Sequence, residues 1–291
     1  MLLIRNVIVD QEKWQKESSD RKKSIMGSDI RIKVAMMQPT FLPWQGFFEL
    51  ICKSDIFIIL DDFQFSVQSY HQRNRLFVNK GQVDWYTVPV QKSVSFGEAL
   101  NKVRINDNAP WRVKAWKRIQ QNYSKASFYS LVAPLVQQWL FKKAESLAAQ
   151  NIAFIKLACD ILDLKREILL SSQFPSATQR SERVAELLRI NSADSYYCAN
   201  GSFDYMLADG LFPLSDVTVL FQDFQPKTYP QIGSPNDFIP YLSVLDALMN
   251  VGPEQTVELI AQGTKKWLTW EEMTAGKKEF LQELRTEKDF L

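Results

Sequence analysis

The sequence predicts an α/β fold built on an open parallel sheet with a helical insertion, and three observations support this prediction. Residues 31–75 place a helix-like segment, 47–53, between two apolar strands, 34–37 and 55–60. Short apolar segments then alternate with helical ones toward the C-terminus, which is typical of parallel strands connected by helices. Residues 110–165 are apolar at helical spacing over most of their length, so we expect the insertion or lobe there.

Further elements follow in chain order. We expect short apolar strands at 84–90, 103–106, 168–172, 196–198 and 217–221. Helices are expected where apolar residues recur three and four positions apart, at 111–123, 129–147, 157–164, 181–188 and 239–248. Pro110 suits a first helical turn, because its fixed φ is helical and it has no N–H to leave unpaired. Thr178 is expected to cap a helix, and Asn250 and Gly252 are expected to end one.

Composition divides the chain into three parts. Residues 1–31 are polar and charged over most of their length, and we expect a flexible leader there. Residues 32–255 hold the strands and the helical part near 110–165, and we interpret them as one α/β domain. Residues 256–291 are charged and helix-prone, which predicts a solvated tail helix.

Bulk composition argues against several classes of protein. The 291 residues are 46% hydrophobic, enough for a large core, and a net charge of +2 gives no electrostatic argument for a nucleic-acid or membrane partner. Cys52, Cys159 and Cys198 form no C-x-x-C pair, so we expect reduced thiols and no structural zinc site. No apolar run approaches the ~20 residues of a membrane span, and no signal-peptide pattern is present, which predicts a cytoplasmic protein.

Polar side chains collect just after the first two strands. The first strand runs into a turn that begins with Gln38 and contains Trp44, both candidates for substrate binding, and the second strand ends in Asp61 and Asp62. In open parallel sheets the loops converge at this edge, and ligands bind there. A carboxylate at such a position can bind a sugar hydroxyl, hold a metal or act as a general base, so both aspartates are candidate catalytic residues. The structural alternative is that one caps a turn and the other faces solvent.

A polar run follows the two aspartates. It begins with Gln64 and ends in Arg73, Asn74 and Arg75, all of which are candidates for substrate binding. Arginine binds phosphate and carboxylate groups through paired hydrogen bonds, and asparagine can both donate and accept. An equally good interpretation is an ion pair between one arginine and one of the aspartates. In an extended strand the two arginines share a face, so the sequence keeps both interpretations open.

His71 is the only histidine in the chain, so no site that needs two histidines is expected. A single histidine is more often a hydrogen-bonded structural residue than a general base, although its pKa class suits proton transfer near neutral pH. No G-x-S-x-G motif accompanies it, and we assign no metal ligand and identify no cofactor. Trp111 and Trp116 lie beside lysines on a predicted helix, and we expect both in the core instead of on a stacking surface.

Several of these motifs together resemble the signature of the WbqC-like proteins. The matching segments are Q-P-T-F-L-P-W-Q-G-F-F at 38–48, D-D-F-Q-F at 61–65, R-N-R at 73–75, A-P-W at 109–111 and Y-P-Q at 229–231. The resemblance covers residues 32–255 and implies a three-layer open sheet with a Rossmann-like opening unit similar to that of nucleotidyltransferases. The chain departs from the latter, because its opening turn lacks their triphosphate-binding histidine. It also has Tyr70 and His71 where Trp and Gln are usual in the WbqC pattern.

The resemblance also implies a function. WbqC-like proteins resemble products of bacterial surface-polysaccharide (O-antigen type) clusters, beside enzymes that make nucleotide-linked amino sugars. We therefore expect a cytoplasmic enzyme that transfers an acyl or aminoacyl group from an acyl donor to the amine of a nucleotide sugar. The arginines would hold a diphosphate or a carboxylate, and one aspartate would orient the sugar or take a proton from its ammonium. The amides of Gln38, Gln64 and Asn74 would bind neutral groups.

Two other classes stay open. A nucleotidyltransferase-like enzyme would use magnesium, which commonly takes one or two protein carboxylates together with phosphate oxygens. A non-catalytic binding or scaffold protein of the same pathway would need no gathered site. The scaffold predicts a diffuse polar surface, whereas either enzyme predicts that candidate residues surround one pocket.

Overall fold

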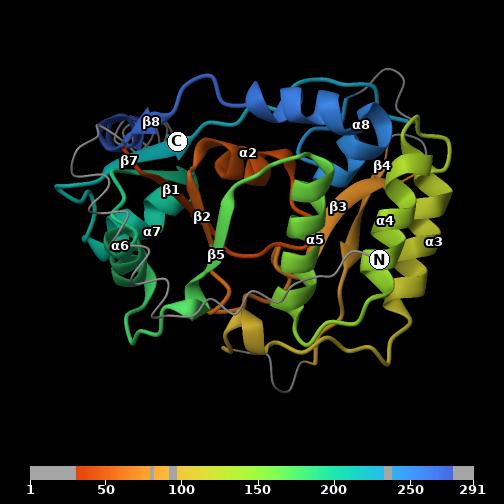
Figure 1. Ribbon diagram of the computed structural model, residues 1–291, viewed down its shortest axis with the longest axis horizontal. Coiled ribbons are helices and arrows are strands. Elements are labelled where there is room, and N and C mark those ends of the chain that lie inside the picture. The colour runs from red at the N-terminus through yellow and green to blue at the C-terminus, as the bar shows by residue number, and fades with distance from the viewer. Residues whose placement is uncertain (1–30, 79–81, 92–96, 233–237, 278–291) are drawn as a thin grey trace, which may run out of the picture.

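A six-stranded sheet of order β5-β2-β1-β6-β7-β8 organises the computed structural model, which describes residues 31–78, 82–91, 97–232 and 238–277. In sheet order the strands are β5 (Glu167–Leu170), β2 (Ile56–Ile59), β1 (Lys33–Met37), β6 (Ser195–Ala199), β7 (Thr218–Gln222) and β8 (Leu268–Thr269). The first five are parallel, and β8 pairs antiparallel with β7 (Figure 1). The chain builds outward from β1 to β2 and β5 and then crosses back to β6, so the strand order reverses between β1 and β6.

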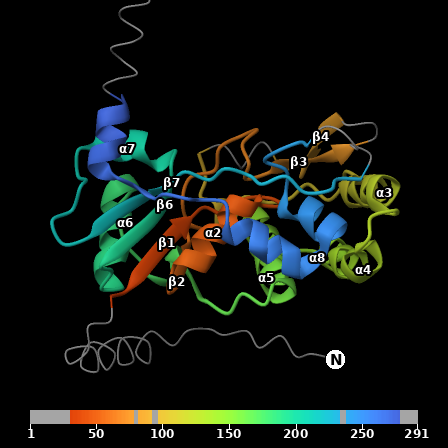
Figure 2. The same cartoon turned by 90° about the horizontal axis from the view of Figure 1, so that it is seen from above.

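Helices cover both faces of this sheet and give the fold three layers. α2 (Gln45–Lys53) packs on one face, and α6 (Arg180–Ile190) and α7 (Ser202–Asp209) pack on the other (Figure 2). The side chains of β1 alternate accordingly, because Ala35 faces the core beneath α2 and Met36 faces the core beneath α6 and α7. The fold is therefore α/β with a mixed, mostly parallel sheet, as the sequence predicts.

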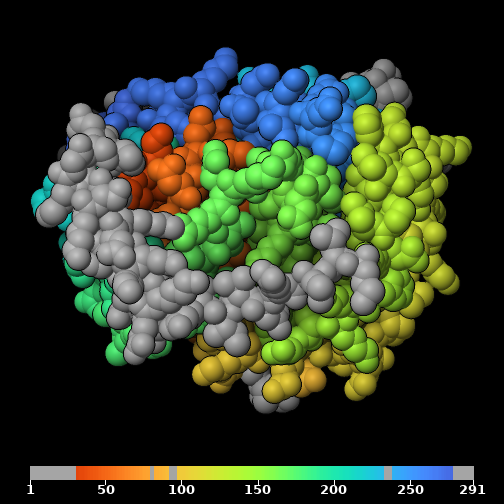
Figure 3. Space-filling model, in the orientation of Figure 1, coloured from red at the N-terminus to blue at the C-terminus, as the bar shows by residue number. Residues whose placement is uncertain are grey.

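A second, mostly helical region packs beside the sheet. It contains α3 (Trp111–Tyr123), α4 (Tyr129–Phe141), α5 (Leu147–Ile161), α8 (Val244–Ala261) and a hairpin of β3 (Arg73–Val78) and β4 (Gln82–Thr87). α3 and α4 lie side by side (Figure 1), and this part of the chain forms one end of the molecule (Figure 3). Asp246 of α8 joins α3 to the segment after β7, because it accepts hydrogen bonds from Tyr123 at 2.7 Å and Tyr229 at 2.8 Å. Burial raises the pKa of Asp246, and the surrounding hydroxyl and amide donors limit that rise.

Some element boundaries differ from the sequence prediction. The segment 103–106 forms no strand; Ile105 makes a single bridge to Val90, after the short 3₁₀ turn η2 (Leu100–Lys102). Gly252, in contrast, ends a helix as expected, because its backbone is not helical and α8 consists of two helices joined across a kink at this residue. Its φ of +81° suits glycine, and a Cβ there would come within 2.5 Å of a ring atom of Phe128.

The tail helix expected at 256–291 is only partly present in the described residues. Residues 256–261 complete α8, β8 then joins the edge of the sheet, and residues 270–277 are helical as expected. The segment between α8 and β8 is tied to α2, because Glu49 accepts hydrogen bonds from the N–H of Thr264 at 2.8 Å and from its hydroxyl. The high charge of residues 256–291 predicted that this segment is solvated, and it gave no sign of the contact with Glu49. Residues 278–291 and almost all of the expected leader lie outside the described residues.

The structure also describes the cysteines and the lengths of the helices. Cys52, Cys159 and Cys198 are free thiols, and burial raises the pKa of Cys159 to about 12. Across the described ranges, every helix is too short or too polar to cross a membrane.

Candidate functional site

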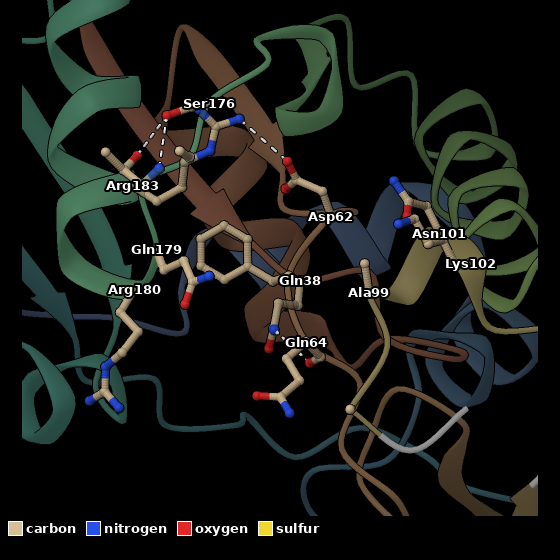
Figure 4. Close-up of a pocket in the computed structure, with 14 residues that line it drawn as sticks. Gln38, Asp62, Gln64, Ala99, Asn101, Lys102, Ser176, Gln179, Arg180 and Arg183 are labelled. Carbon is tan, nitrogen blue, oxygen red and sulfur yellow. Dashed lines mark hydrogen bonds and ion pairs between the residues drawn. The ribbon is translucent and has the colours of Figure 1, made fainter. Parts of the chain in front are cut away.

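A pocket of about 720 Å³ opens at the carboxyl ends of β1, β2 and β5. Three parts of the chain line it: residues that follow β1 and β2, the loop and η2 turn at 97–102, and the start of α6 at 176–183. Gln38, Asp62 and Gln64, which the sequence singles out, lie together in this lining (Figure 4). The pocket is thus at the edge where ligands bind in open α/β sheets.

The two aspartates after β2 have different surroundings. Asp61 is 4% exposed, and its carboxylate accepts hydrogen bonds from the N–H of Ser172 at 3.0 Å, the hydroxyl of Ser172 at 2.7 Å and the amide of Asn101 at 3.4 Å. Asp62 lines the pocket and keeps 30% of its side chain exposed. The Ser171 hydroxyl lies between them, within hydrogen-bonding distance of both carboxylates. Asp61 therefore ties two loops together, and Asp62 is the carboxylate that a ligand can reach.

Arg183 places a positive charge beside Asp62. Its side chain is only 4% exposed, and its guanidinium donates to Asp62 at 3.3 Å (Figure 4). The same group donates to Glu186 at 3.0 Å. It also donates to the carbonyls of Ser171 at 2.7 Å and Phe174 at 2.5 Å, which closes the turn after β5. Partial burial raises the pKa of Glu186, but hydrogen bonds from two hydroxyls and from Arg183 outweigh it and leave that pKa below its usual value. This pocket wall is therefore an ion-paired network that needs no ligand to hold its geometry.

His71 fixes the orientation of Gln38 in the pocket wall. The imidazole is buried, and its Nδ1 accepts a hydrogen bond from the N–H of Ser66 at 3.2 Å, so the ring proton is on Nε2. Nε2 donates to Gln38 Oε1 at 3.0 Å. The Gln38 NH₂ group therefore points away from the imidazole, 3.5 Å from the Gln64 carbonyl, and is free to donate to a ligand as well. Burial lowers the pKa of His71 to about 4, so the ring is neutral at pH 7.

One cation adds positive potential to the pocket. Lys102 lines it, and within the described ranges the ammonium has no carboxylate partner within 4.0 Å. It favours a negative group in the ligand. The start of α6 also faces the pocket, but its first turn already holds a carboxylate, because Asp209 accepts hydrogen bonds from the N–H of Ser181 at 3.4 Å and from its hydroxyl at 2.7 Å. Arg180 turns away from the pocket (Figure 4) and pairs with the same Asp209 at 2.6 Å.

The remaining sequence-predicted residues lie outside this lining. Trp44 packs against aromatic rings at the start of α2. Asn74 is buried and donates to the Leu42 carbonyl at 2.7 Å, so it holds the turn after β1 against β3. Arg73 and Arg75 alternate with Asn74 and therefore project from the other face of β3. The predicted residues thus form two groups, one in the pocket and one at the β3 hairpin.

Sequence reasoning did not single out Asn101, Lys102 and Arg183 of the pocket lining, or Ser171, which contacts Asp62 from behind it. They lie in 3₁₀ turns or inside a helix, where no motif marks them. The only sequence pattern that pointed to this wall was Thr178, which predicted that a helix begins shortly after β5. Thr178 is not the N-cap, however, because Gln179 occupies that position and the Thr178 hydroxyl donates to Glu186 at 2.6 Å. Across the described residues, no group of three or more His, Cys, Asp or Glu side chains converges as metal ligands would.

Comparison with known proteins places the chain in a family. Residues 38–258 match the WbqC-like protein family. The uncharacterized protein Rv1507c of Mycobacterium tuberculosis (strain ATCC 25618 / H37Rv) is 30% identical over 224 residues, which are 76% of this chain and 95% of that protein. No solved structure matches. Because the matched range contains the whole pocket lining and the β3 hairpin, the sequence motifs and the geometry lead to the same conclusion: the chain belongs to the WbqC-like protein family.

Proposed function

We propose that this protein is an enzyme of bacterial surface-polysaccharide biosynthesis that transfers an acyl or aminoacyl group to the amine of a nucleotide-linked amino sugar. The observation that supports this best is the pocket, where Gln38, Asp62 and Gln64 from two neighbouring strand ends face one cavity. A scaffold protein without a small ligand has no need to gather them. The substrate class comes from the family resemblance, and the polar lining of the pocket suits a sugar.

Each polar group of the lining has a role in this proposal. Asp62 binds the sugar ammonium or a neighbouring hydroxyl. Because Arg183 already donates to Asp62 at 3.3 Å, we assign this carboxylate to orienting the nucleophile instead of removing its proton. Gln38 donates its NH₂ to an acceptor atom of the ligand, and Gln64 provides a second amide. Lys102 faces the place where negative charge develops.

The chemistry is nucleophilic acyl transfer. The deprotonated amine attacks the carbonyl carbon of an activated acyl donor, such as a thioester. A C–N bond forms, and the bond to the leaving group breaks with its electron pair. The ammonium loses one proton to water before the attack, and the nitrogen loses a second proton after it, which passes to the leaving group. The carbonyl oxygen carries negative charge between these steps, and the cationic side of the pocket stabilises it.

The test uses purified protein, a panel of nucleotide-linked amino sugars and activated acyl donors, with products followed by mass spectrometry. We expect Asp62→Asn to lower turnover by roughly a hundredfold or more, because a misplaced nucleophile loses the advantage of orientation. The variant should keep the thermal stabilisation that a bound nucleotide sugar provides. Asp160→Asn, at an exposed carboxylate of α5, is the matched control and should keep full activity. Full turnover in Asp62→Asn would contradict the role of Asp62.

Other results would select another class. If a nucleoside triphosphate stabilises the protein only with magnesium, and pyrophosphate is released, the nucleotidyltransferase-like interpretation of the opening unit replaces ours. If none of these compounds changes the melting temperature at concentrations that saturate ordinary sites, the protein is a binding or scaffold component of the pathway.

A further inference from the structure

Two arginines stand next to each other on one face of the β3–β4 hairpin. Asn74 points into the core, so Arg73 and Arg75 project together from the opposite face, roughly 7 Å apart along the strand. Both side chains are half-buried, and the Nε atom of each is buried without a hydrogen-bond partner. Such groups are costly to leave unsatisfied in a folded protein.

The surroundings of these two arginines differ from those of comparable residues. Among the described residues, every other arginine that is buried or half-buried has a carboxylate partner: Arg112 with Asp107, Arg118 with Asp84, and Arg183 with Asp62 and Glu186. Neither Arg73 nor Arg75 has a carboxylate within 4.0 Å in the same ranges. Two neighbouring cations that have lost part of their hydration repel each other, and an anion between them would remove that penalty.

One aromatic ring and the backbone of Tyr241 lie beside the pair. The Arg73 guanidinium lies 4.3 Å from the centre of the Trp85 ring, and Trp85 is directly opposite Arg75 in the hairpin. Arg75 reaches the Tyr241 carbonyl at 3.5 Å. Tyr241 is 42% exposed and has a φ of +60°, which a bulky residue rarely adopts. Strained backbone of this kind gathers at ligand sites, where surrounding structure holds it.

We propose that Arg73 and Arg75 bind the diphosphate of a nucleotide-linked ligand, with Trp85 and Tyr241 beside it as surfaces for stacking. Two guanidinium groups provide paired donors for two phosphate groups, which a single lysine does not. This inference rests on the proposed function only for the identity of the ligand. The nucleotide sugar whose diphosphate binds here would extend toward the pocket. His71, two residues before Arg73, donates to Gln38 of the pocket wall and so connects the two places.

Binding of inorganic pyrophosphate and of uridine diphosphate, measured by calorimetry without any acyl donor, tests this site. We expect Arg73→Gln and Arg75→Gln each to weaken both ligands by about tenfold or more, as loss of a paired charged hydrogen bond does. Arg75→Lys keeps the charge without the fork and should fall in between. Arg189→Gln, at an exposed arginine in the last turn of α6, removes the same charge and should change affinity less than about twofold.

Further variants separate this proposal from the proposed function. Asp62→Asn should bind pyrophosphate like the wild type, so loss of turnover and loss of diphosphate binding are independent results. Tyr241→Ala should weaken uridine diphosphate and leave pyrophosphate unchanged. Unchanged pyrophosphate affinity in well-folded Arg73→Gln and Arg75→Gln, judged by circular dichroism, would overturn the proposal. A loss of pyrophosphate affinity confined to Lys102→Gln would also overturn it, because the diphosphate would then bind in the pocket. Equal affinity for the dicarboxylate malonate would overturn it as well.

Discussion

The pocket at the strand ends and the face of the β3 hairpin both contain arginines that are at least half-buried, but their positive charge is balanced in different ways. In the pocket wall, Arg183 is neutralised by two carboxylates and two carbonyls of the protein itself. At the hairpin, Arg73 and Arg75 have neither among the described residues, apart from the long contact to the Tyr241 carbonyl. The first arrangement fixes a geometry before any ligand arrives, whereas the second leaves the counter-charge for a ligand to supply. Charge balance therefore distinguishes a preformed wall from a binding surface.

The largest effect is expected where that balance is internal. Arg183→Gln leaves the Asp62 and Glu186 carboxylates without their cation and two carbonyls without a donor. Breaking a buried ion pair by removing one partner costs about 3–5 kcal/mol, and we expect the free energy of unfolding to fall by that amount. Urea denaturation followed by circular dichroism measures it.

A matched change on the hairpin sharpens the comparison. Arg73→Gln removes the same charge from a place without a carboxylate partner, so the free energy of unfolding should change by less than about 1 kcal/mol. A loss of several kcal/mol there, equal to that of Arg183→Gln, would show that both arginines are structural and would remove the distinction between the two regions.

An intermediate effect is expected at His71, where the pocket and the hairpin meet. Burial holds its pKa near 4 in the folded protein, against an ordinary value of 6.5. Between these values the unfolded chain binds a proton that the folded protein does not, so the stabilisation is complete above pH 6.5 and is lost as pH falls toward 4. The shift corresponds to at most about 3 kcal/mol. Urea denaturation at pH 7 and pH 4.5 should show a smaller pH-dependent loss in His71→Gln than in the wild type.

Because the chain has one histidine, nitrogen-15 NMR gives an independent measurement of the same group. We expect a neutral ring with the proton on Nε2 at pH 7, as required by the hydrogen bond from the N–H of Ser66. A proton on Nδ1 would reverse the amide orientation that we assign to Gln38. A pKa near 6.5 would show that the ring is solvated and would remove the expected pH dependence.

Part of the site could be predicted from the sequence because it depends on strand ends. Gln38, Asp62 and Gln64 follow two apolar strands directly, and parallel pairing of those strands brings their ends together. The partners of these residues could not be predicted in this way. Arg183 and Ser171 come from loops and a helix more than a hundred residues later in the chain, and their contacts depend on how β5 and α6 pack.

The fold shows the same limit. Alternating apolar strands and helices predicted the α/β class, because each element buries its own periodic face. The sequence did not predict that β3 and β4 form a hairpin, since β3 has a charged or polar residue at each of its first three positions, Arg73 to Arg75. Whether Asp61 or Asp62 faces the pocket was also open, and it is decided by Ser172, whose N–H and hydroxyl both donate to Asp61.

The smallest predicted effect is the most specific to the hairpin. Without a ligand, Arg73→Gln relieves repulsion from Arg75, so at low ionic strength it should raise the free energy of unfolding by a few tenths of a kcal/mol; about 1 M salt should screen this gain. With pyrophosphate the wild type should become more stable than Arg73→Gln, because pyrophosphate stabilises the folded wild type by binding and stabilises the variant much less. Melting temperatures at two salt concentrations, with and without pyrophosphate, measure all of this, with Arg189→Gln as the exposed control. If Arg73→Gln is less stable than the wild type at every salt concentration, the contact of Arg73 with Trp85 is structural, and the hairpin charge is balanced by the protein after all.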